Sequence, residues 1–202
     1  MPSIYDLKPK FQGLLRPIVK GLAKAGVTAN QVTVFAMIVS IAAGVLVFLF
    51  PTSPWPLFLI PIVLFVRMAL NAIDGMLARE HDMSTPLGAI LNELGDVISD
   101  TALYLPLLFV PGLAPFLIVS IVILSIISEM TGVVAIQIGA QRRYDGPMGK
   151  SDRAFMFGLL ALLLAFGVSP EGWSNWYLSA MILLLSITTI NRARNALKEI
   201  QQ

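Results

Sequence analysis

Residues 71–100 read NAIDGMLAREHDMSTPLGAILNELGDVISD, and they bring polar and acidic side chains to the adjoining ends of two long apolar stretches. Before the central loop, residues spaced three and four apart share one face of a helix: Asn71, Asp74 and Ala78. After the loop, a second stripe recurs at every fourth residue: Gly88, Asn92, Asp96 and Asp100. A short loop would turn these two helices toward each other, which predicts a polar site between them.

The rest of the chain consists mostly of further apolar stretches. Of its 202 residues, 56% are hydrophobic and 13% are charged, about half the charged fraction of soluble domains. Six stretches reach or approach the roughly 20 apolar residues that cross a bilayer: 31–50, 57–78, 88–110, 113–139, 154–169 and 174–190. We therefore predict an all-α integral membrane protein with six transmembrane helices. The composition excludes a single-core soluble enzyme, a disordered chain and, since cysteine is absent, a disulfide scaffold.

Basic residues gather on one side of the predicted membrane. Of the 14 Lys and Arg residues, 13 lie in residues 1–30, in the 79–87 and 140–153 connections or at the C-terminal end. Only Arg67 lies within an apolar stretch. The positive-inside rule makes this side cytoplasmic and places both termini there. The net charge of +2 gives no reason to expect a nucleic-acid partner.

Three regions follow from these patterns. Residues 1–30 form an amphipathic interfacial segment, residues 31–192 the six-helix membrane domain, and residues 193–202 a cytoplasmic tail. The first region repeats apolar residues at helical spacing: Phe11, Leu14, Leu15, Ile18 and Leu22. We expect it to lie in the inner membrane surface, although a simple positively charged anchor explains the same residues.

The facing polar stripes favour a cation site. Carboxylate and amide oxygens suit Mg²⁺, Mn²⁺ or Ca²⁺, and Mg²⁺ commonly combines one or two carboxylates with substrate phosphates. Small residues at 75, 78 and 88 would admit a ligand, and Arg79 is placed to pair with a phosphate. The alternative is a polar helix pair that only holds the bundle together.

At these residues the sequence resembles the CDP-alcohol phosphatidyltransferase family, whose signature is D-x2-D-G-x2-A-R-x8-G-x3-D-x3-D. The spacing matches without gaps from Asn71 to Asp96, but Asn71 and Asn92 stand where the family has aspartate. The sequence also looks like a bacterial inner-membrane branch of the family that carries asparagine at both of these positions. Two further segments look like the family's: Thr28, Asn30 and Thr33 before the first stretch, and Gly149, Lys150 and Arg153 before the fifth.

The resemblance implies transfer of a phosphatidyl-type group from a CDP-linked lipid, such as CDP-diacylglycerol, to an acceptor hydroxyl, with release of CMP. It implies Asp96 as the general base and Mg²⁺ or Mn²⁺ held by Asn71, Asp74, Asn92 and Asp96. It implies CDP binding by Thr28, Asn30, Asn71, Asp74, Gly75, Ala78, Arg79 and Gly88. It also implies a homodimer and a site facing the cytoplasm in a bacterial inner membrane. Glu93 and Asp100 would replace the two missing carboxylates only if the helices rotate.

The acceptor side is expected to involve Lys150, Arg153, Arg67 and Asp100. Arg67, Asp100 and Glu129 lie about 18–21 Å from the inner ends of their helices, at 1.5 Å per residue, so we predict that Arg67 pairs with Asp100 or Glu129. Acceptor binding by Arg67 remains the alternative. Two other functions stay open: a catalytically silent nucleotide- or lipid-binding scaffold, which the two asparagines permit, and a small transporter, for which no repeated halves are visible.

Overall fold

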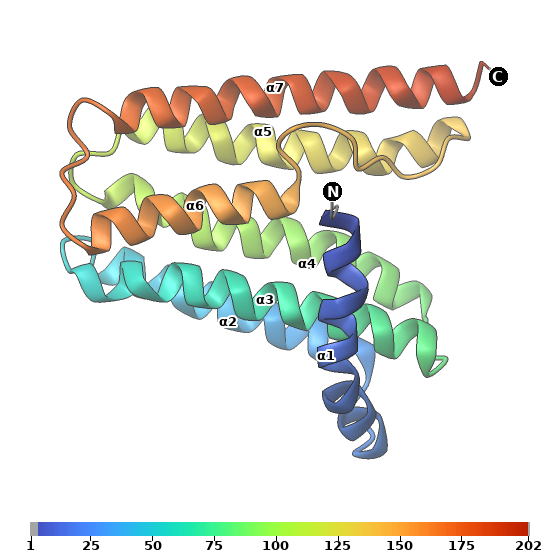
Figure 1. Ribbon diagram of the computed structural model, residues 1–202. Coiled ribbons are helices and arrows are strands. Elements are labelled where there is room, and N and C mark those ends of the chain that lie inside the picture. The colour runs from blue at the N-terminus through green and yellow to red at the C-terminus, as the bar shows by residue number, and fades with distance from the viewer. Residues whose placement is uncertain (1–3, 202) are drawn as a thin grey trace.

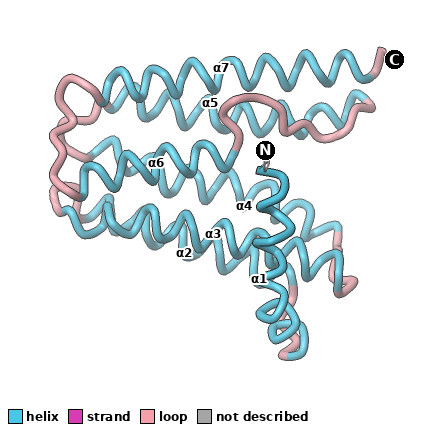
Figure 2. Tube along the Cα trace, viewed as in Figure 1, coloured by secondary structure: helices cyan, strands magenta, loops and turns pink. Residues whose placement is uncertain are grey.

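The computed structural model describes residues 4–201, with side chains from residue 11 onward. Residues 1–3 and the side chains of residues 4–10, from the expected interfacial segment, lie outside the described residues, as does Gln202. The described chain forms helices and turns without a strand (Figure 2). Its elements are α1 Ile4–Lys24, α2 Ala29–Leu49, α3 Pro54–Glu80, α4 Pro86–Tyr104, η1 Leu105–Phe109, α5 Pro115–Val134, η2 Ala135–Ile138, α6 Lys150–Ala165 and α7 Ser174–Glu199.

Helices α2 to α7 lie alongside one another, and α1 crosses them near one end (Figure 1). The most extensive packing joins α2 to α3 and α4, α3 to α6, and α5 to α7. Successive helices alternate in direction, so the connections 81–85 and 139–149 lie at the same end as the C-terminus (Figure 1). The fold therefore gathers the polar connections predicted from the sequence at one end of the bundle.

Three parts of the chain are long and apolar enough to cross a membrane: α2, α3 and residues Pro115–Ile138. Helix α4 carries Glu93, Asp96 and Asp100, and α6 has only 16 residues, which explains why these two do not qualify by length and composition alone. The protein is thus all-helical with three candidate membrane spans. Six spans and cytoplasmic termini stay predictions.

Helix α1 divides its apolar residues between the bundle and the surface. Leu15 and Val19 are buried in a cluster with Ile73, Met76 and Leu77. Leu14 and Ile18, which the spacing placed on the same face, are 77% and 52% exposed. Helix α1 therefore anchors to α3 along one edge and leaves an apolar strip free, as an interfacial helix needs.

Two helices near the polar site begin with side-chain caps. Thr28 and Gln31 form a capping box at the start of α2, with Thr28 Oγ1 accepting from the Gln31 N–H at 3.3 Å and Gln31 Oε1 accepting from the Thr28 N–H at 2.9 Å. Thr85 Oγ1 accepts from the Gly88 N–H at 2.9 Å at the start of α4. These caps fix where α2 and α4 begin.

Two helix ends differ from the sequence prediction. The stretch 88–110 is not one helix, because α4 ends at Tyr104 and continues as the 3-10 turn η1 around Pro106, which has no N–H for an α-helical hydrogen bond. Helix α7 continues to Glu199 through the region expected to be a tail. Burial of Arg192 and Ala196 against the bundle accounts for this extension.

Helix α2 approaches α4 very closely at Gly44. A Cβ atom on Gly44 would lie 1.9 Å from the Ala102 carbonyl oxygen, so only glycine fits there. On the other side of α4, the Tyr104 ring stacks on Phe157 of α6 with 3.9 Å between ring centroids. Helix α4 is therefore fixed from both sides, which sets the position of its polar stripe.

Candidate active site

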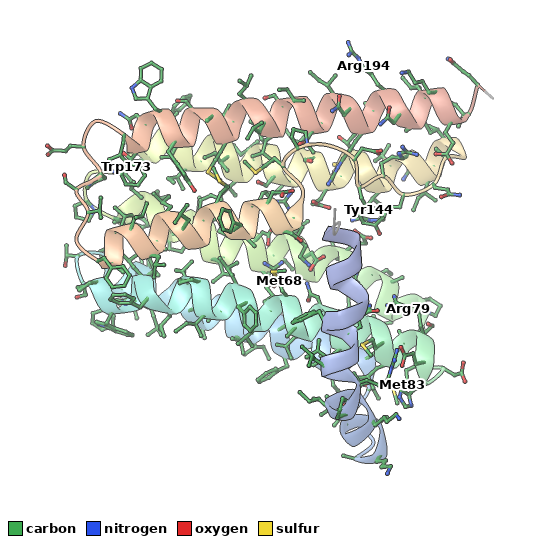
Figure 3. The ribbon with its side chains drawn as sticks, in the orientation of Figure 1. Met68, Arg79, Met83, Tyr144, Trp173 and Arg194 are labelled. Carbon is green, nitrogen blue, oxygen red and sulfur yellow. The ribbon has the colours of Figure 1, made fainter. Side chains whose placement is uncertain are left out.

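A cavity of about 260 Å³ lies between α2, α3 and α4, at the end of the bundle where Arg79 and Met83 are found and away from Trp173 (Figure 3). It is lined by Ala29, Asn30, Thr33, Asp74, Gly75, Ala78, Arg79, Met83, Ser84, Thr85, Gly88, Ala89 and Asn92. The structure thus brings together most residues that the resemblance assigns to CDP. Thr28 and Asn71 are not among them: the contact that Thr28 makes is the α2 cap, and Asn71 lines a second cavity described below.

Gly88 faces the Asn30 side chain of α2 at close range. A Cβ atom there would lie 2.6 Å from Oδ1 of Asn30. Asn30 also donates through Nδ2 to Oγ1 of Thr85 at 3.2 Å, which ties the start of α2 to the start of α4. The small residue therefore lets two polar side chains form one wall of the cavity, which is a physical reason for that position of the signature.

Asp74 is a buried carboxylate in the wall of this cavity. Its side chain accepts a hydrogen bond from Thr33 Oγ1 at 2.7 Å, and the residue is only 5% exposed. Among the described residues it forms no ion pair, unlike Asp96, Asp100, Glu93 and Glu129. A buried charge without a counter-ion is costly, so the position suits a bound cation. The sequence assigned Thr33 no role at the site, because its contact with Asp74 depends on how α2 packs against α3.

Asp96 is the last residue of the signature and lies on α4, where three side chains contact it. Asn71 Nδ2 donates to Asp96 Oδ1 at 3.3 Å, Lys150 Nζ forms an ion pair with the same oxygen, and Arg67 Nη2 lies 3.5 Å from it. Arg67 Nη2 also donates to the main-chain carbonyl of Asp96 at 3.0 Å. The predicted base is therefore anchored in a polar cluster formed by α3, α4 and α6.

A second cavity, of about 160 Å³, adjoins this cluster between α3 and α6. It is lined by Leu64, Arg67, Met68, Asn71, Lys150, Ser151 and Ala154. All three side chains that contact Asp96 belong to this lining. The two cavities therefore follow one another along the same face of α3, with Asp74 at one and the Asp96 cluster at the other.

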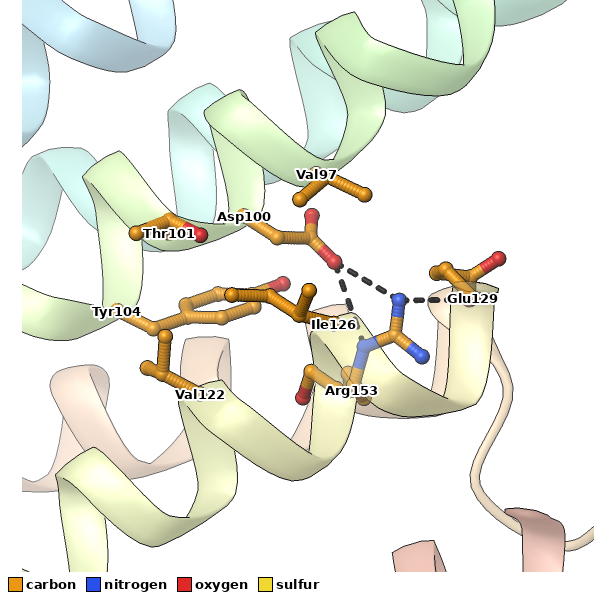
Figure 4. A pocket seen from close by; sticks show the side chains of 9 residues that line it. Val97, Asp100, Thr101, Tyr104, Val122, Ile126, Glu129 and Arg153 are labelled. Carbon is orange, nitrogen blue, oxygen red and sulfur yellow. Dashed lines mark hydrogen bonds and ion pairs between the residues drawn. The ribbon is translucent and has the colours of Figure 1, made fainter. Parts of the chain in front are cut away.

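The prediction for Arg67 is confirmed. Arg67 Nη1 pairs with Asp100. Arg153 Nη2 pairs with the other oxygen of Asp100 at 2.9 Å and with Glu129 at 3.0 Å, as Figure 4 shows. Arg67, Asp100 and Arg153 are 3%, 4% and 1% exposed. The void beside Asp100 and Arg153 has a volume of about 10 Å³, room for a single water molecule. The space beside Asp100 and Arg153 is therefore too small for a substrate. Arg67 contacts both Asp100 and Asp96 and so connects them.

Glu93 does not replace a missing signature carboxylate. Both of its oxygens pair with Arg142 at 2.6 Å, and Arg142 also contacts Glu129 at 3.1 Å. Burial lowers the pKa of Arg142, but the hydrogen bonds and charge of Glu93 more than offset this effect and hold the pKa above its ordinary value. Glu93 and Asp100 are thus both committed to arginines, and of these contacts the pairing of Glu93 with Arg142 was not predicted from the sequence.

The connection 139–149 is fixed to α7 as well as to α4. Arg143 Nη1 pairs with Glu199 at 2.7 Å, and Arg143 Nε pairs with Asp145 at 2.7 Å. The hydrogen bonds from Arg143 hold the pKa of Asp145 below its usual range. The contact with Glu199 helps to hold the last turn of α7. The connection then leads into α6, whose first residue is Lys150.

The signature of this chain offers a cation fewer carboxylates than the family signature does. No group of three or more His, Cys, Asp or Glu side chains suited to a metal occurs in the described part of the chain. Asp74 and Asn92 line one cavity, however, and they provide the carboxylate and amide oxygens that hard divalent cations accept. The donor set therefore fits one divalent ion that completes its coordination with substrate oxygens or water.

Comparisons with known proteins agree with this geometry. The family model for CDP-alcohol phosphatidyltransferase matches residues 26–190. The "Inner membrane protein YnbA" of Escherichia coli K12 is 49% identical over 195 residues, covering 96% of each chain. The phosphatidylinositol phosphate synthase of Mycobacterium marinum is 28% identical over 191 residues, covering 89% of this chain and 76% of its own.

Solved structures share the fold. Mycobacterium tuberculosis phosphatidylinositol phosphate synthase (PgsA1) in complex with manganese and citrate superposes with a TM-score of 0.74 at 23% identity, over 89% of this chain and 87% of its own. The same enzyme with CDP-DAG bound gives a TM-score of 0.70 at 24% identity, over 91% and 92%. With the family model spanning most of the chain and the signature residues gathered around one cavity, this protein belongs to the CDP-alcohol phosphatidyltransferase family.

Proposed function

We propose that the protein transfers a phosphatidyl-type group from a CDP-linked lipid, CDP-diacylglycerol, to the hydroxyl of a small alcohol and releases CMP. One observation carries this proposal: the cavity lined by Asp74, Gly75, Arg79, Gly88 and Asn92 is followed along the same face of α3 by a second cavity, and three residues of that second lining contact Asp96. Donor and acceptor thus have separate, successive spaces along the signature. The family membership and the CDP-DAG complex of PgsA1 support the same assignment.

The larger cavity would hold the CDP group. Arg79 would pair with a phosphate, and Gly75 with Ala78 would let the nucleotide approach the α3 backbone. Asp74 and Asn92 would hold Mg²⁺ or Mn²⁺, the second of which PgsA1 contains in its solved complex, whereas Asn71 lines the smaller cavity. When bound, this ion would neutralise the pyrophosphate and polarise the phosphorus under attack.

Asp96 would act as the general base. Its three side-chain donors all contact Oδ1, so we assign proton abstraction to Oδ2. The acceptor hydroxyl, placed in the smaller cavity, loses its proton to Asp96 as its oxygen bonds to the lipid-side phosphorus. The bond from that phosphorus to the CMP oxygen breaks, and CMP leaves with the electron pair. Lys150 and Arg67 would orient the acceptor. Asp100, which pairs with both Arg67 and Arg153, would hold Arg67 in position.

The proposal extends to location and assembly. The basic residues at the site end of the bundle favour a cytoplasmic site in a bacterial inner membrane, with both termini on that side. This placement suits the substrates, because a CDP group comes from water whereas its acyl chains stay in lipid. Dimerisation is proposed from the family resemblance alone.

Product analysis tests this function. Purified protein is incubated with CDP-diacylglycerol, Mn²⁺ and pooled alcohols that include polyols, amino alcohols, sugars and phosphorylated polyols, and the lipids are analysed by mass spectrometry. A new phospholipid carrying one of these alcohols supports the proposal and identifies the acceptor. If no alcohol yields a product, the silent-scaffold alternative, which Asn71 and Asn92 favour, takes its place.

A further inference from the structure

We propose that Lys150 supplies, from within the chain, the positive charge that a second divalent ion would bring to Asp96, so that the protein binds one divalent ion, at Asp74. This inference rests on the proposed function for the identity of the site. Its evidence is the distribution of charges among the residues that the structure describes.

The two signature carboxylates differ in their counter-ions. Asp96 has an ion pair with Lys150 and a longer one of 3.5 Å with Arg67. Asp74, at 5% exposure, forms no ion pair among the described residues, and its side-chain hydrogen-bond partner is the hydroxyl of Thr33. A divalent ion therefore gains most at Asp74, since Asp96 is already neutralised.

Asn71 strengthens this division. Its amide nitrogen donates to Asp96 Oδ1 at 3.3 Å, so the side chain presents a donor where a carboxylate would present a further anionic oxygen. An aspartate at this position would face Asp96 at the same separation and would require a cation between the two carboxylates. In this chain the amide of Asn71 and the ammonium group of Lys150 both contact Asp96, so no second cation is needed beside it.

Lys150 is held where it can play this part. It is the first residue of α6, directly after Gly149, whose N–H donates to Asp152 Oδ2 at 2.9 Å and so fixes the start of the helix. Its side chain is 31% exposed and lines the smaller cavity, so the ammonium group stays hydrated while it contacts Asp96. A cation attached to the chain cannot dissociate, unlike a metal ion.

The test counts Mn²⁺ ions bound to the purified full-length protein by electron paramagnetic resonance, with Mn²⁺ alone as the probe. We expect one ion per wild-type chain, none in Asp74→Asn, and a dissociation constant within threefold of wild type in Asp96→Asn. Two ions in wild type, none in wild type, or loss of binding in Asp96→Asn would overturn the inference.

A second comparison isolates Lys150. Asn71→Asp creates a second pair of carboxylates, and we expect the second Mn²⁺ to bind at least about tenfold more tightly in Asn71→Asp/Lys150→Met than in Asn71→Asp alone, because one opposing charge is removed. Asn71→Asp/Lys24→Met, which removes an exposed lysine, is the matched control. Equal affinities in the two double variants would contradict the role of Lys150.

These measurements are separate from transfer activity. If wild type binds one ion but forms no lipid product with any alcohol, the proposed function fails and the charge assignment stands. If it forms product but binds two ions, the assignment to Lys150 fails and the proposed function stands.

Discussion

Asn71 on α3 donates a hydrogen bond to Asp96 on α4 across 3.3 Å, and Asn71 also lines the smaller cavity. The family signature has aspartate at the first of these positions. An amide there can hold the proposed base in place without adding a charge, which aspartate cannot do unless a cation lies between the two side chains. The substitution is therefore compatible with an organised site.

Replacing Asn71 with alanine is expected to slow CMP release without much effect on donor binding. The change removes one of the donors that orient Asp96, and a hydrogen bond to a charged group contributes about 1.5–3 kcal/mol, which corresponds to a fall in kcat of roughly tenfold to a hundredfold. KM for the CDP-linked lipid should change less than twofold. Asn175→Ala, at an exposed position near the other end of the bundle, is the control.

Thr33→Val is expected to weaken the binding of Mn²⁺ and donor. The hydroxyl of Thr33 donates to Asp74 at 2.7 Å, and its loss leaves the buried carboxylate without that partner. We expect KM for the lipid donor to rise several-fold while kcat changes less. Thr131→Val removes a hydroxyl that bonds only within its own helix, at 2.8 Å from the Ile127 carbonyl, and should leave KM unchanged. Equal effects of the two variants would contradict a special role for Thr33.

Arg67→Met should destabilise the protein strongly. The variant leaves Asp100 with one of its two arginines and removes a contact to the main chain of Asp96. Removing one partner of a buried ion pair typically costs about 3–5 kcal/mol, whereas loss of the exposed Arg194 should cost under about 0.5 kcal/mol. Unfolding in mixed detergent with increasing sodium dodecyl sulfate measures both variants. Similar stabilities for Arg67→Met and Arg194→Met would refute the structural role of the pair.

Gly44→Ala should disrupt the contact between α2 and α4. Its Cβ would lie 1.9 Å from the Ala102 carbonyl oxygen, so the helices would have to separate, and overpacking of this kind costs about 1–3 kcal/mol or more. Gly21→Ala on α1 meets no atom within 4 Å and should be neutral or slightly stabilising. The midpoint of thermal unfolding in detergent distinguishes the two variants, and an unchanged midpoint in Gly44→Ala would be incompatible with this packing.

The sequence predicted much of this architecture because its strongest signals are local. Apolar stretches located most helix ends to within a few residues, apart from the ends of α4 and α7, and the four-residue spacing placed Asn92 and Asp96 on one side of α4. Depth along the helices predicted the pairing of Arg67 with Asp100. These features depend on helix geometry, which sequence spacing determines directly.

Other features depend on how distant elements pack. The division of the signature between two cavities could not be read from spacing, since it follows from the placement of α2 against Asp74 and of α6 against Asp96. The pairing of Glu93 with Arg142 joins residues 49 positions apart through the conformation of the 139–149 connection. The extension of α7 likewise reflects burial of Arg192, a contact that no local pattern encodes.

The most direct test of the central claim is Mn²⁺-dependent release of CMP from CDP-diacylglycerol in the presence of the alcohol found by product analysis. We predict release by wild type and by Asp82→Asn, a loop carboxylate outside both cavities, and a loss of at least about 100-fold in Asp96→Asn and Asp74→Asn. Chelation of the metal should abolish release in every variant. Undiminished release by Asp96→Asn would contradict its assignment as the base, and release that does not depend on Asp74 would contradict the site itself.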